Sequence, residues 1–267
     1  MHNIGMEVIK RNGEKERIQF DKITNRISNL CSSEDLKKID PIIIAQKTIN
    51  QIYDGISTVK LDNESAKICA SMSTQNPVYN LLGGKICISN LHKSTDKSFV
   101  ATMKKLYDRI DINNEHRPLI TKKFLNTVIK FGNEFEGMID WSRDLNYDYF
   151  GFKTLEKSYL MKLNDEIVER PQHMIMRVAI CIHESDIKKV KETYDLISNG
   201  FFTHASPTLY NAGTIYPQLS SCFLGTIEDS LDCIYDTLKD CALISKRAGG
   251  IGLSASDVRA NQSLIRG

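Results

Sequence analysis

The region after residue 200 has the pattern that most limits the possible folds. Strand-like segments at 201–211 and 218–227 are followed by a helical pattern from Asp229 to about Lys246 and by a short strand-like segment at 251–256. Strands that alternate with helices are typical of a parallel or mixed sheet whose functional loops lie at strand ends. No helical pattern follows the last strand before Gly267, so we expect an incomplete sheet in this chain.

The N-terminal region has a different pattern. Residues 6–20 alternate apolar and polar side chains on either side of Asn12-Gly13, which predicts a β-hairpin with a type I′ turn, a turn that needs positive φ at both central residues. In a helical pattern that follows, Asp40 can cap the helix and Pro41 suits its first turn. Two strands and four helices predict a compact α+β module. The four helical patterns cover 21–31, 40–55, 61–73 and 76–94.

The middle of the chain is predicted to be helical. Segments 99–110 and 121–132 place apolar residues at i, i+3 or i+4, and i+7. Two further helical patterns, at 170–183 and 185–200, precede the strand-like region, and the second of them starts on a Ser-Asp cap and ends at a glycine.

Charge and hydropathy exclude several classes of protein. The net charge is +2, and 35 basic residues are spread among 33 acidic ones without a long run, so we expect no nucleic-acid partner and only local contacts to anions. The first residues lack the apolar core of a signal peptide, and no stretch approaches the roughly 18 apolar residues of a membrane span. We therefore expect a soluble cytoplasmic protein without a membrane partner.

The cysteines and histidines give no metal or disulfide pattern. Seven cysteines without a CxxC pair argue against a disulfide framework and a zinc knuckle, and most are expected to be buried and reduced. Six scattered histidines show no HxxH or HExxH spacing, so we assign no metal.

Cys222 and the glycines after residue 248 can each be interpreted in two ways. Cys222 lies between small hydroxyl residues and an apolar stretch, so it is either a buried structural thiol or a redox or nucleophilic thiol. Gly249, Gly250 and Gly252 follow a helical pattern, where they either end the helix or let the backbone approach a ligand. Because there is no GxxxxGK[ST] motif, phosphates would have to be held by helix N-termini, hydroxyls and basic side chains.

Basic residues surround the predicted hairpin. They form either a solvated face, partly neutralised by Glu14 and Glu16, or an anion site. These basic residues are Lys10, Arg11, Lys15, Arg17 and Lys22.

Nine stretches carry a family resemblance: VIKRNGEKERIQFDKIT, STVKLD, SNLHK, YDYFGFKTLEKSYL, ERPQHMIMRVA, FFTHASPTLYNAGT, PQLSSCF, IYDTLKDCALISKRAGGIG and VRA. With them the chain resembles the large (α) subunit of class I ribonucleotide reductase, of the eukaryotic and large-DNA-virus type. The stretches occur in family order over nearly the whole chain.

The resemblance implies a fold that the patterns alone do not reach. It implies an α+β ATP-cone in residues 1–95, then, in residues 96–267, a helical segment and the first part of a ten-stranded α/β barrel. It also implies reduction of ribonucleotides to deoxyribonucleotides by thiyl-radical chemistry, with a radical that comes from a metal-containing small subunit.

Catalytic and substrate positions carry over from the family. Cys222 matches the first of two reducing cysteines, which together replace the 2′ hydroxyl and become a disulfide. Ser206, Ser221 and Gly250 match substrate-contacting positions, where a hydroxyl and a backbone N–H can donate to a diphosphate.

Effector positions carry over as well, for ATP or dATP in the cone and for deoxynucleoside triphosphates at a specificity site. The expected specificity residues are Asp229, Ser230, Leu231, Lys246 and Arg259. The expected cone residues are Lys10, Arg11, Glu16, Arg17, Ile18, Gln19, Phe20, Asp21, Lys22, Thr58, Asp62 and Lys93. Cations suit a triphosphate, and a carboxylate such as Asp62 suits a ribose or base.

The family's radical cysteine, second reducing cysteine and radical-transfer tyrosines lie beyond the matched region, so we expect these 267 residues alone to be inactive. Two hypotheses remain: the front part of a reductase large subunit, or a catalytically empty nucleotide-binding or subunit-interaction protein derived from it. The first implies a ribonucleoside diphosphate substrate, a homo-oligomer, the small subunit, and thioredoxin or glutaredoxin as partners.

Overall fold

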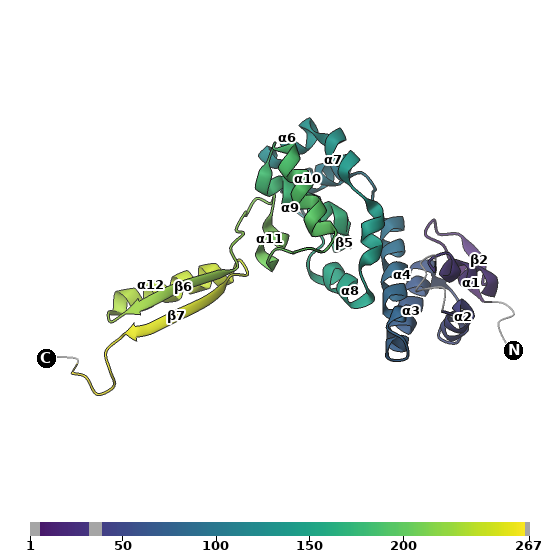
Figure 1. Ribbon diagram of the computed structural model, residues 1–267, viewed down its shortest axis with the longest axis horizontal. Helices are drawn as coiled ribbons and strands as arrows, with labels where there is room; N and C mark the ends of the chain where they lie inside the picture. Colours follow the sequence, from purple (N-terminus) through teal and green to yellow (C-terminus); the bar gives the residue numbers. More distant parts are fainter. Residues whose placement is uncertain (1–5, 32–38, 265–267) are drawn as a thin grey trace. The chain divides into compact units, whose positions relative to one another are not determined.

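The computed structural model describes residues 6–31 and 39–264. The first five residues, which carry part of the argument against a signal peptide, and Gly267 lie outside the described residues. The chain divides into two compact units, and Figure 1 labels their helices and strands. The first unit combines the chain up to Thr102 with Met138–His173, and the second combines Met103–Gly137 with the chain from Met174 onward. In the described part of the chain, no helix is both long and apolar enough to cross a membrane.

The first unit begins with the predicted β-hairpin. Strands β1 (Glu7–Ile9) and β2 (Lys15–Arg17) pair antiparallel, and β3 (Ile56–Ser57), which the patterns missed, pairs parallel with β1. The predicted type I′ turn is wrong, because of its two central residues Gly13 has a positive φ, of 84°, and Asn12 does not. The backbone carbonyl of Lys10 accepts from the Gly13 N–H, and the backbone N–H of Lys10 donates to the Glu14 carbonyl. The loop therefore has three residues, of which the last, Gly13, is in the left-handed conformation.

Four helices complete this module, as predicted. They are α1 (Phe20–Ser28), α2 (Pro41–Ile49), α3 (Thr58–Ser71) and α4 (Val78–Ser94). The Asp40 cap is confirmed, because its carboxylate accepts from the Ile42 N–H at 2.9 Å. Ser57 caps α3 in the same way, through the Lys60 N–H. Helices α3 and α4 pack side by side and bring together residues from 58–71 and 78–94.

The first unit also contains the 3₁₀ helices η2 (Met72–Thr74) and η3 (Trp141–Asn146) and helix α8 (Tyr149–Ser158), which pack on α4. It has a second short hairpin, of β4 (Lys162–Leu163) and β5 (Glu166–Ile167). Gly84 of α4 lies so close to the segment before α8 that an added Cβ would stand 2.9 Å from the Asp148 Cα. A larger residue would therefore push α4 and α8 apart.

The second unit is helical up to residue 211. Its helices are α5 (Phe99–Tyr107), α6 (Lys122–Lys130), α7 (Gly132–Met138), α9 (Pro171–His183), α10 (Ile187–Ser198) and α11 (Ser206–Asn211); α5 and α9 each begin in the first unit. Asp186 caps α10, as predicted. The predicted strand at 201–211 is wrong, because Ser206-Pro207 opens α11 instead. Proline suits the first helical turn, where its missing N–H costs nothing.

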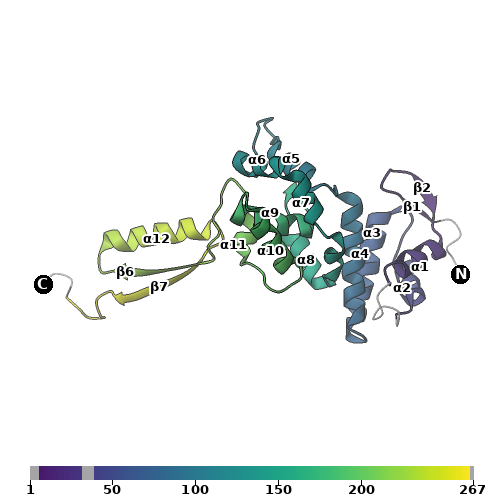
Figure 2. The ribbon, with the colours of Figure 1, turned by 45° about the horizontal axis from the view of Figure 1, so that its top comes forward.

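A β-α-β unit follows. Strand β6 (Cys222–Glu228), helix α12 (Leu231–Ser245) and strand β7 (Gly250–Asp257) confirm the three predicted elements. The strands are parallel, and Cys222 pairs with Gly250. Figure 2 shows α12 lying along both strands, as expected for the connection between two parallel strands. Within the described residues, β6 and β7 pair with each other and with no other strand.

Candidate nucleotide and redox sites

A cavity of about 480 Å³ opens in the first unit between the hairpin, α1, α3 and α4. Its size suits a small-molecule ligand, since such pockets are typically about 300–1,000 Å³. The wall combines a charged side with an apolar side. The charged and polar lining residues are Lys10, Arg11, Asn12, Glu16, Arg17, Gln19, Lys22, Arg26, Thr58, Asp62, Ser65 and Lys93. The apolar ones are Val8, Ile18, Ile23, Ile27, Leu61 and Ile86.

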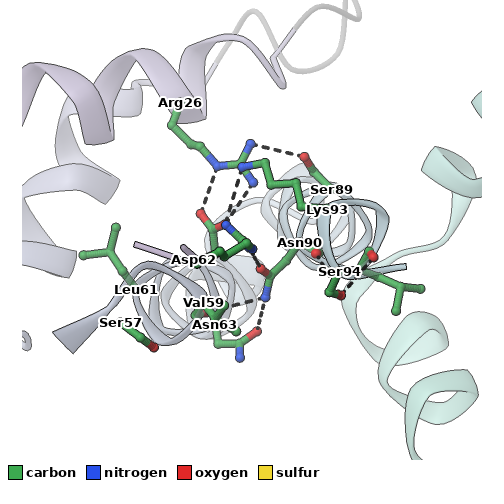
Figure 3. Close-up of polar contacts among 12 residues, drawn as sticks. Arg26, Ser57, Val59, Leu61, Asp62, Asn63, Ser89, Asn90, Lys93 and Ser94 are labelled. Atoms are coloured by element: carbon green, nitrogen blue, oxygen red, sulfur yellow. Dashed lines mark hydrogen bonds and ion pairs between the residues drawn. The ribbon is translucent and has the colours of Figure 1, made fainter. Parts of the chain in front are cut away.

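Asp62 of α3 is the centre of the charged side. Asp62 is 5% exposed. Arg26 of α1 donates to both of its carboxylate oxygens: Arg26 Nε lies 2.9 Å from Oδ1, and Arg26 Nη2 lies 3.0 Å from Oδ2. Figure 3 shows the Arg26 guanidinium reaching from α1 to Asp62 and to Ser89 of α4. A buried charge is costly unless paired, so this ion pair fixes the carboxylate.

Two further cations face the same carboxylate. Arg11 Nη2 lies 3.6 Å and Lys93 Nζ 3.8 Å from Asp62 Oδ2. Arg11 also donates to Asn90 Oδ1. Figure 3 shows the Asn90 amide beside Asn63, to whose Oδ1 it donates at 3.3 Å. The hairpin, α3 and α4 are thus joined by one polar network at the cavity wall.

Burial lowers the pKa of the Lys93 ammonium below its ordinary value. Asp62 opposes this shift of the pKa, while Arg26 and Arg11 reinforce it. A bound polyanion would favour the protonated amine, so Lys93 is matched to an anionic ligand.

Glu16 offers a second centre on the hairpin. Lys10 and Lys22 both pair with its carboxylate. Six cationic side chains and two carboxylates line the cavity, so the net charge of its wall is positive. Such a charge attracts polyanions.

Ten of the twelve residues expected to bind nucleotide line this one cavity. The other two, Phe20 and Asp21, are exposed at the start of α1 and do not line it. Sequence reasoning missed Arg26 and, apart from Ile18, the apolar wall. Lys22 and Arg26 lie four residues apart, which places them on one face of a helix, and this spacing was the available signal for Arg26.

Cys222 lies in the second unit and is exposed, unlike Cys69 and Cys87. Burial raises the pKa of Cys87 to about 12 and also raises that of Cys69, so these two thiols stay protonated. The buried structural interpretation therefore fits Cys69 and Cys87 and does not fit Cys222. All seven cysteines are free.

The structure brings Ser221, Cys222 and Gly250 together. The Ser221 hydroxyl lies 3.6 Å from the Cys222 sulfur, and the Gly250 N–H donates to the Ser221 carbonyl at 2.6 Å. A Cβ on Gly250 would stand 3.2 Å from that carbonyl oxygen and 3.9 Å from the Cys222 Sγ. A glycine at the start of β7 thus keeps the surroundings of the thiol open.

Gly249, which follows α12, lies close to neighbouring side chains of the protein. The residue in the left-handed conformation at the end of this helix is Ala248, with φ 61°, so none of the glycines acts as the left-handed cap. A Cβ on Gly249 would stand 2.6 Å from Ile244 and 2.9 Å from Phe223. The helix-cap interpretation is therefore wrong for these positions.

Ser206 is the first residue of α11, which is tied to the segment before β6. The Thr208 hydroxyl donates to the Leu219 carbonyl at 2.9 Å, and the Asn211 amide donates to the Gln218 carbonyl at 2.7 Å. Buried Arg177 donates to the carbonyls of Leu209 and Ala212 and so closes the other end of the helix.

The expected specificity residues fall into two places. Arg259 Nε lies 2.5 Å from Asp229 Oδ2, and Ser230 caps α12 by accepting from the Cys233 N–H. Leu231 follows in the first turn and is 73% exposed. Lys246 is at the opposite end of the 15-residue helix. At 1.5 Å per residue, that end is roughly 22 Å away.

Among the described residues, no group of three or more His, Cys, Asp or Glu side chains is placed to hold a metal ion.

Comparison with known proteins identifies the first module. The ATP cone domain model matches residues 6–94 and covers the cavity described above, so this part of the chain is a nucleotide effector domain. Two further models match: the all-alpha domain of ribonucleotide reductase at 145–216 and its barrel domain at 220–267.

Curated relatives agree with these matches. The chain is similar to the ribonucleoside-diphosphate reductase large subunit of Monkeypox virus, 54% identical over 98% of this chain and 34% of that protein. Its counterparts in Dictyostelium discoideum and Schizosaccharomyces pombe are 53% and 49% identical over 98% of this chain, which covers 31% and 33% of them. The chain belongs to the family of ribonucleotide reductase large subunits. It spans about a third of the length of the curated relatives it matches.

Proposed function

We propose that the chain is the N-terminal part of a ribonucleoside-diphosphate reductase large subunit, which reduces ribonucleotides to deoxyribonucleotides under nucleotide control. The observation that carries the proposal is one chain that holds both a cation-lined cavity in an ATP cone and an exposed Cys222 beside Ser221 and Gly250. A nucleotide sensor alone would not need the second group.

In the cone, the cavity would hold ATP or dATP. Lys10, Arg11, Lys22 and Lys93 would contact the triphosphate, because their charges are only partly neutralised by the two carboxylates of the wall. The base would lie against the apolar side. Asp62 would face the ribose or base, as the sequence suggests.

In the second unit, Cys222 would be one of two reducing thiols. Two thiols give two electrons and two protons, the 2′ hydroxyl of the substrate leaves as water, and the thiols end as a disulfide. Ser206 and Ser221 would contact the diphosphate substrate, and Gly250, whose N–H donates to the Ser221 carbonyl, would let the substrate come close because it has no side chain. The second thiol and the radical cysteine would come from the region that follows the matched third.

Regulation would involve a second effector. Asp229, Ser230, Leu231 and Arg259 would contribute to a site for deoxynucleoside triphosphates, and Lys246 would reach such a site from the far end of α12 in a homo-oligomer. The proposal also includes the small subunit and thioredoxin or glutaredoxin as partners. It further includes a cytoplasmic location, a chain without a metal of its own and a domain boundary near residue 95.

Two measurements test the function. Calorimetry on the 267-residue chain should show saturable ATP or dATP binding, and its absence from a folded chain would contradict the effector role. Ribonucleotide reduction should appear when the chain is joined to the C-terminal two thirds of a relative and supplied with a small subunit, and Cys222→Ser should abolish multiple turnover. Nucleotide binding without any rescued reduction would favour a catalytically empty regulatory protein.

A further inference from the structure

Arg26 is the most firmly fixed of the cations around Asp62. Three of its guanidinium nitrogens donate: Nε and Nη2 to the two Asp62 oxygens, and Nη1 to the Ser89 hydroxyl at 3.1 Å. An arginine that binds both oxygens of a carboxylate has the strongest geometry available to such a pair. Arg26 therefore joins α1 to α3 and α4 at the cavity wall.

Arg11 and Lys93 are held differently. Their nitrogens lie 3.6 and 3.8 Å from Asp62 Oδ2, beyond hydrogen-bond distance. Lys93 is also the more exposed partner, with 40% of its side chain accessible against 26% for Arg26. Both cations interact with the Asp62 carboxylate electrostatically, and their side chains can move away from it without breaking a hydrogen bond to it.

We propose that Arg26 is the resident counter-ion of Asp62, so that Arg11 and Lys93 are not needed to pair this carboxylate and can bind the phosphates of a nucleoside triphosphate. This rests on the proposed nucleotide function of the cavity and assigns a role to a residue that the sequence did not single out. A buried carboxylate needs a cation at all times. Because Arg26 supplies it, the other two cations can move to a ligand while Asp62 stays paired. Arg11 donates one hydrogen bond to Asn90 and keeps its remaining guanidinium N–H groups for a ligand.

If Arg26 pairs Asp62 and does not touch the ligand, its removal should weaken triphosphate binding only indirectly. In Arg26→Gln, Asp62 would recruit Arg11 and Lys93 as its partners, and the affinity for a triphosphate would fall about tenfold, the equivalent of one strong charge-assisted contact. In a chain that already carries Asp62→Asn, no carboxylate competes for these cations. Adding Arg26→Gln should then change the affinity by less than about twofold.

The experiment is calorimetric titration of the 267-residue chain with ATP and, separately, with inorganic tripolyphosphate. The variants are Arg26→Gln, Asp62→Asn and the double variant, with circular dichroism to confirm folding. Arg109→Gln is the matched control, since it removes the same charge from a partly exposed position in the other unit.

A tenfold loss in Arg26→Gln that disappears in the Asp62→Asn background supports the proposal. A loss that persists in that background means that Arg26 holds phosphate itself and overturns it, as does an unchanged affinity in the single variant. If Arg26→Gln fails to fold, the comparison of Asp62→Asn with the double variant decides alone, because neither carries a buried unpaired carboxylate. Failure of the unmodified chain to bind ATP would instead contradict the nucleotide function of the cavity.

Discussion

Cys222 and Lys93 differ from other residues of their type in this chain in ways that can be measured directly. Cys222 is exposed next to a hydroxyl and a glycine, whereas Cys69 and Cys87 are buried. Lys93 is half-buried among charges, and its pKa is lowered. Chemical reactivity in the first case and pH dependence in the second follow from these surroundings.

We expect Cys222 to react with iodoacetamide well before Cys69 and Cys87. Only the thiolate is nucleophilic, and a pKa of about 12 leaves Cys87 almost wholly protonated near neutral pH. Mass spectrometry after brief labelling of the native chain should find the modification at Cys222 and lose it in Cys222→Ser. Equal early labelling of Cys87 in the folded chain would contradict the burial on which this rests.

We expect ATP affinity to fall with rising pH earlier than an ordinary lysine would allow. The ligand favours protonated Lys93, so binding is strongest below the pKa of the free chain and weakens as pH rises through it. Since burial lowers that pKa below its ordinary value, the decline should begin at a lower pH. Calorimetry between pH 7 and pH 10 measures it, at roughly constant ionic strength.

Lys93→Arg is the matched control for that experiment. An arginine stays protonated throughout this pH range, so the decline should be much reduced. A decline of the same size in the arginine variant would assign the pH dependence to another group.

At the scale of elements, the strongest local signals predicted the structure and the tertiary ones were missed. The Asp40-Pro41 start of α2 and the β6-α12-β7 succession are encoded by cap residues and by periodicity, which act locally. The strand β3 has two residues and exists because it pairs with β1, far away in sequence. No local pattern specifies such a strand.

The wrong strand at 201–211 has a different cause. Its aromatic and threonine residues have strand propensity, but Pro207 fits the first turn of a helix, and Thr208 and Leu209 are buried when that helix forms. Buried Arg177 then satisfies the carbonyls at the end of α11. Burial and capping by a distant residue outweighed local propensity.

Glycine substitutions test the packing of these elements. Gly84→Ala should destabilise the chain by about 2 kcal/mol, because the overpacking penalty outweighs the roughly 1 kcal/mol that alanine gains in a helix. The added Cβ would collide with the backbone of Tyr147 and Asp148, which cannot swing away as the end of a flexible side chain could. Urea unfolding followed by circular dichroism measures the change.

Gly137→Ala is the control, since it also lies in a helix but an added Cβ there would meet no atom within 4 Å. It should leave stability unchanged or raise it by up to about 1 kcal/mol. Equal effects of the two substitutions would mean that the close approach of α4 to residues 147–148 does not contribute to stability.

At the scale of the whole molecule, the β6-α12-β7 unit has apolar side chains that water reaches. Leu224 of β6 is 91% exposed, and Leu231, Tyr235 and Leu238 of α12 are 73%, 66% and 62% exposed. Parallel sheets are normally covered on both faces, and uncovered strands offer unpaired edges. These features were predictable from the strand-helix alternation, but the residues left uncovered were not, because sequence does not say which faces meet.

We expect the 267-residue chain to associate with itself as its concentration rises, since contiguous exposed apolar surface favours contact between copies. Sedimentation velocity from about 1 to 100 μM should show a growing fraction of larger species, because this range covers dissociation constants in the micromolar range. Leu238→Lys should reduce that fraction, because it places a charge on the exposed face of α12, whereas Lys60→Gln, on an exposed position of α3, should not change it. A chain that stays monomeric at the highest concentration would contradict the prediction that these exposed side chains mediate contact between copies.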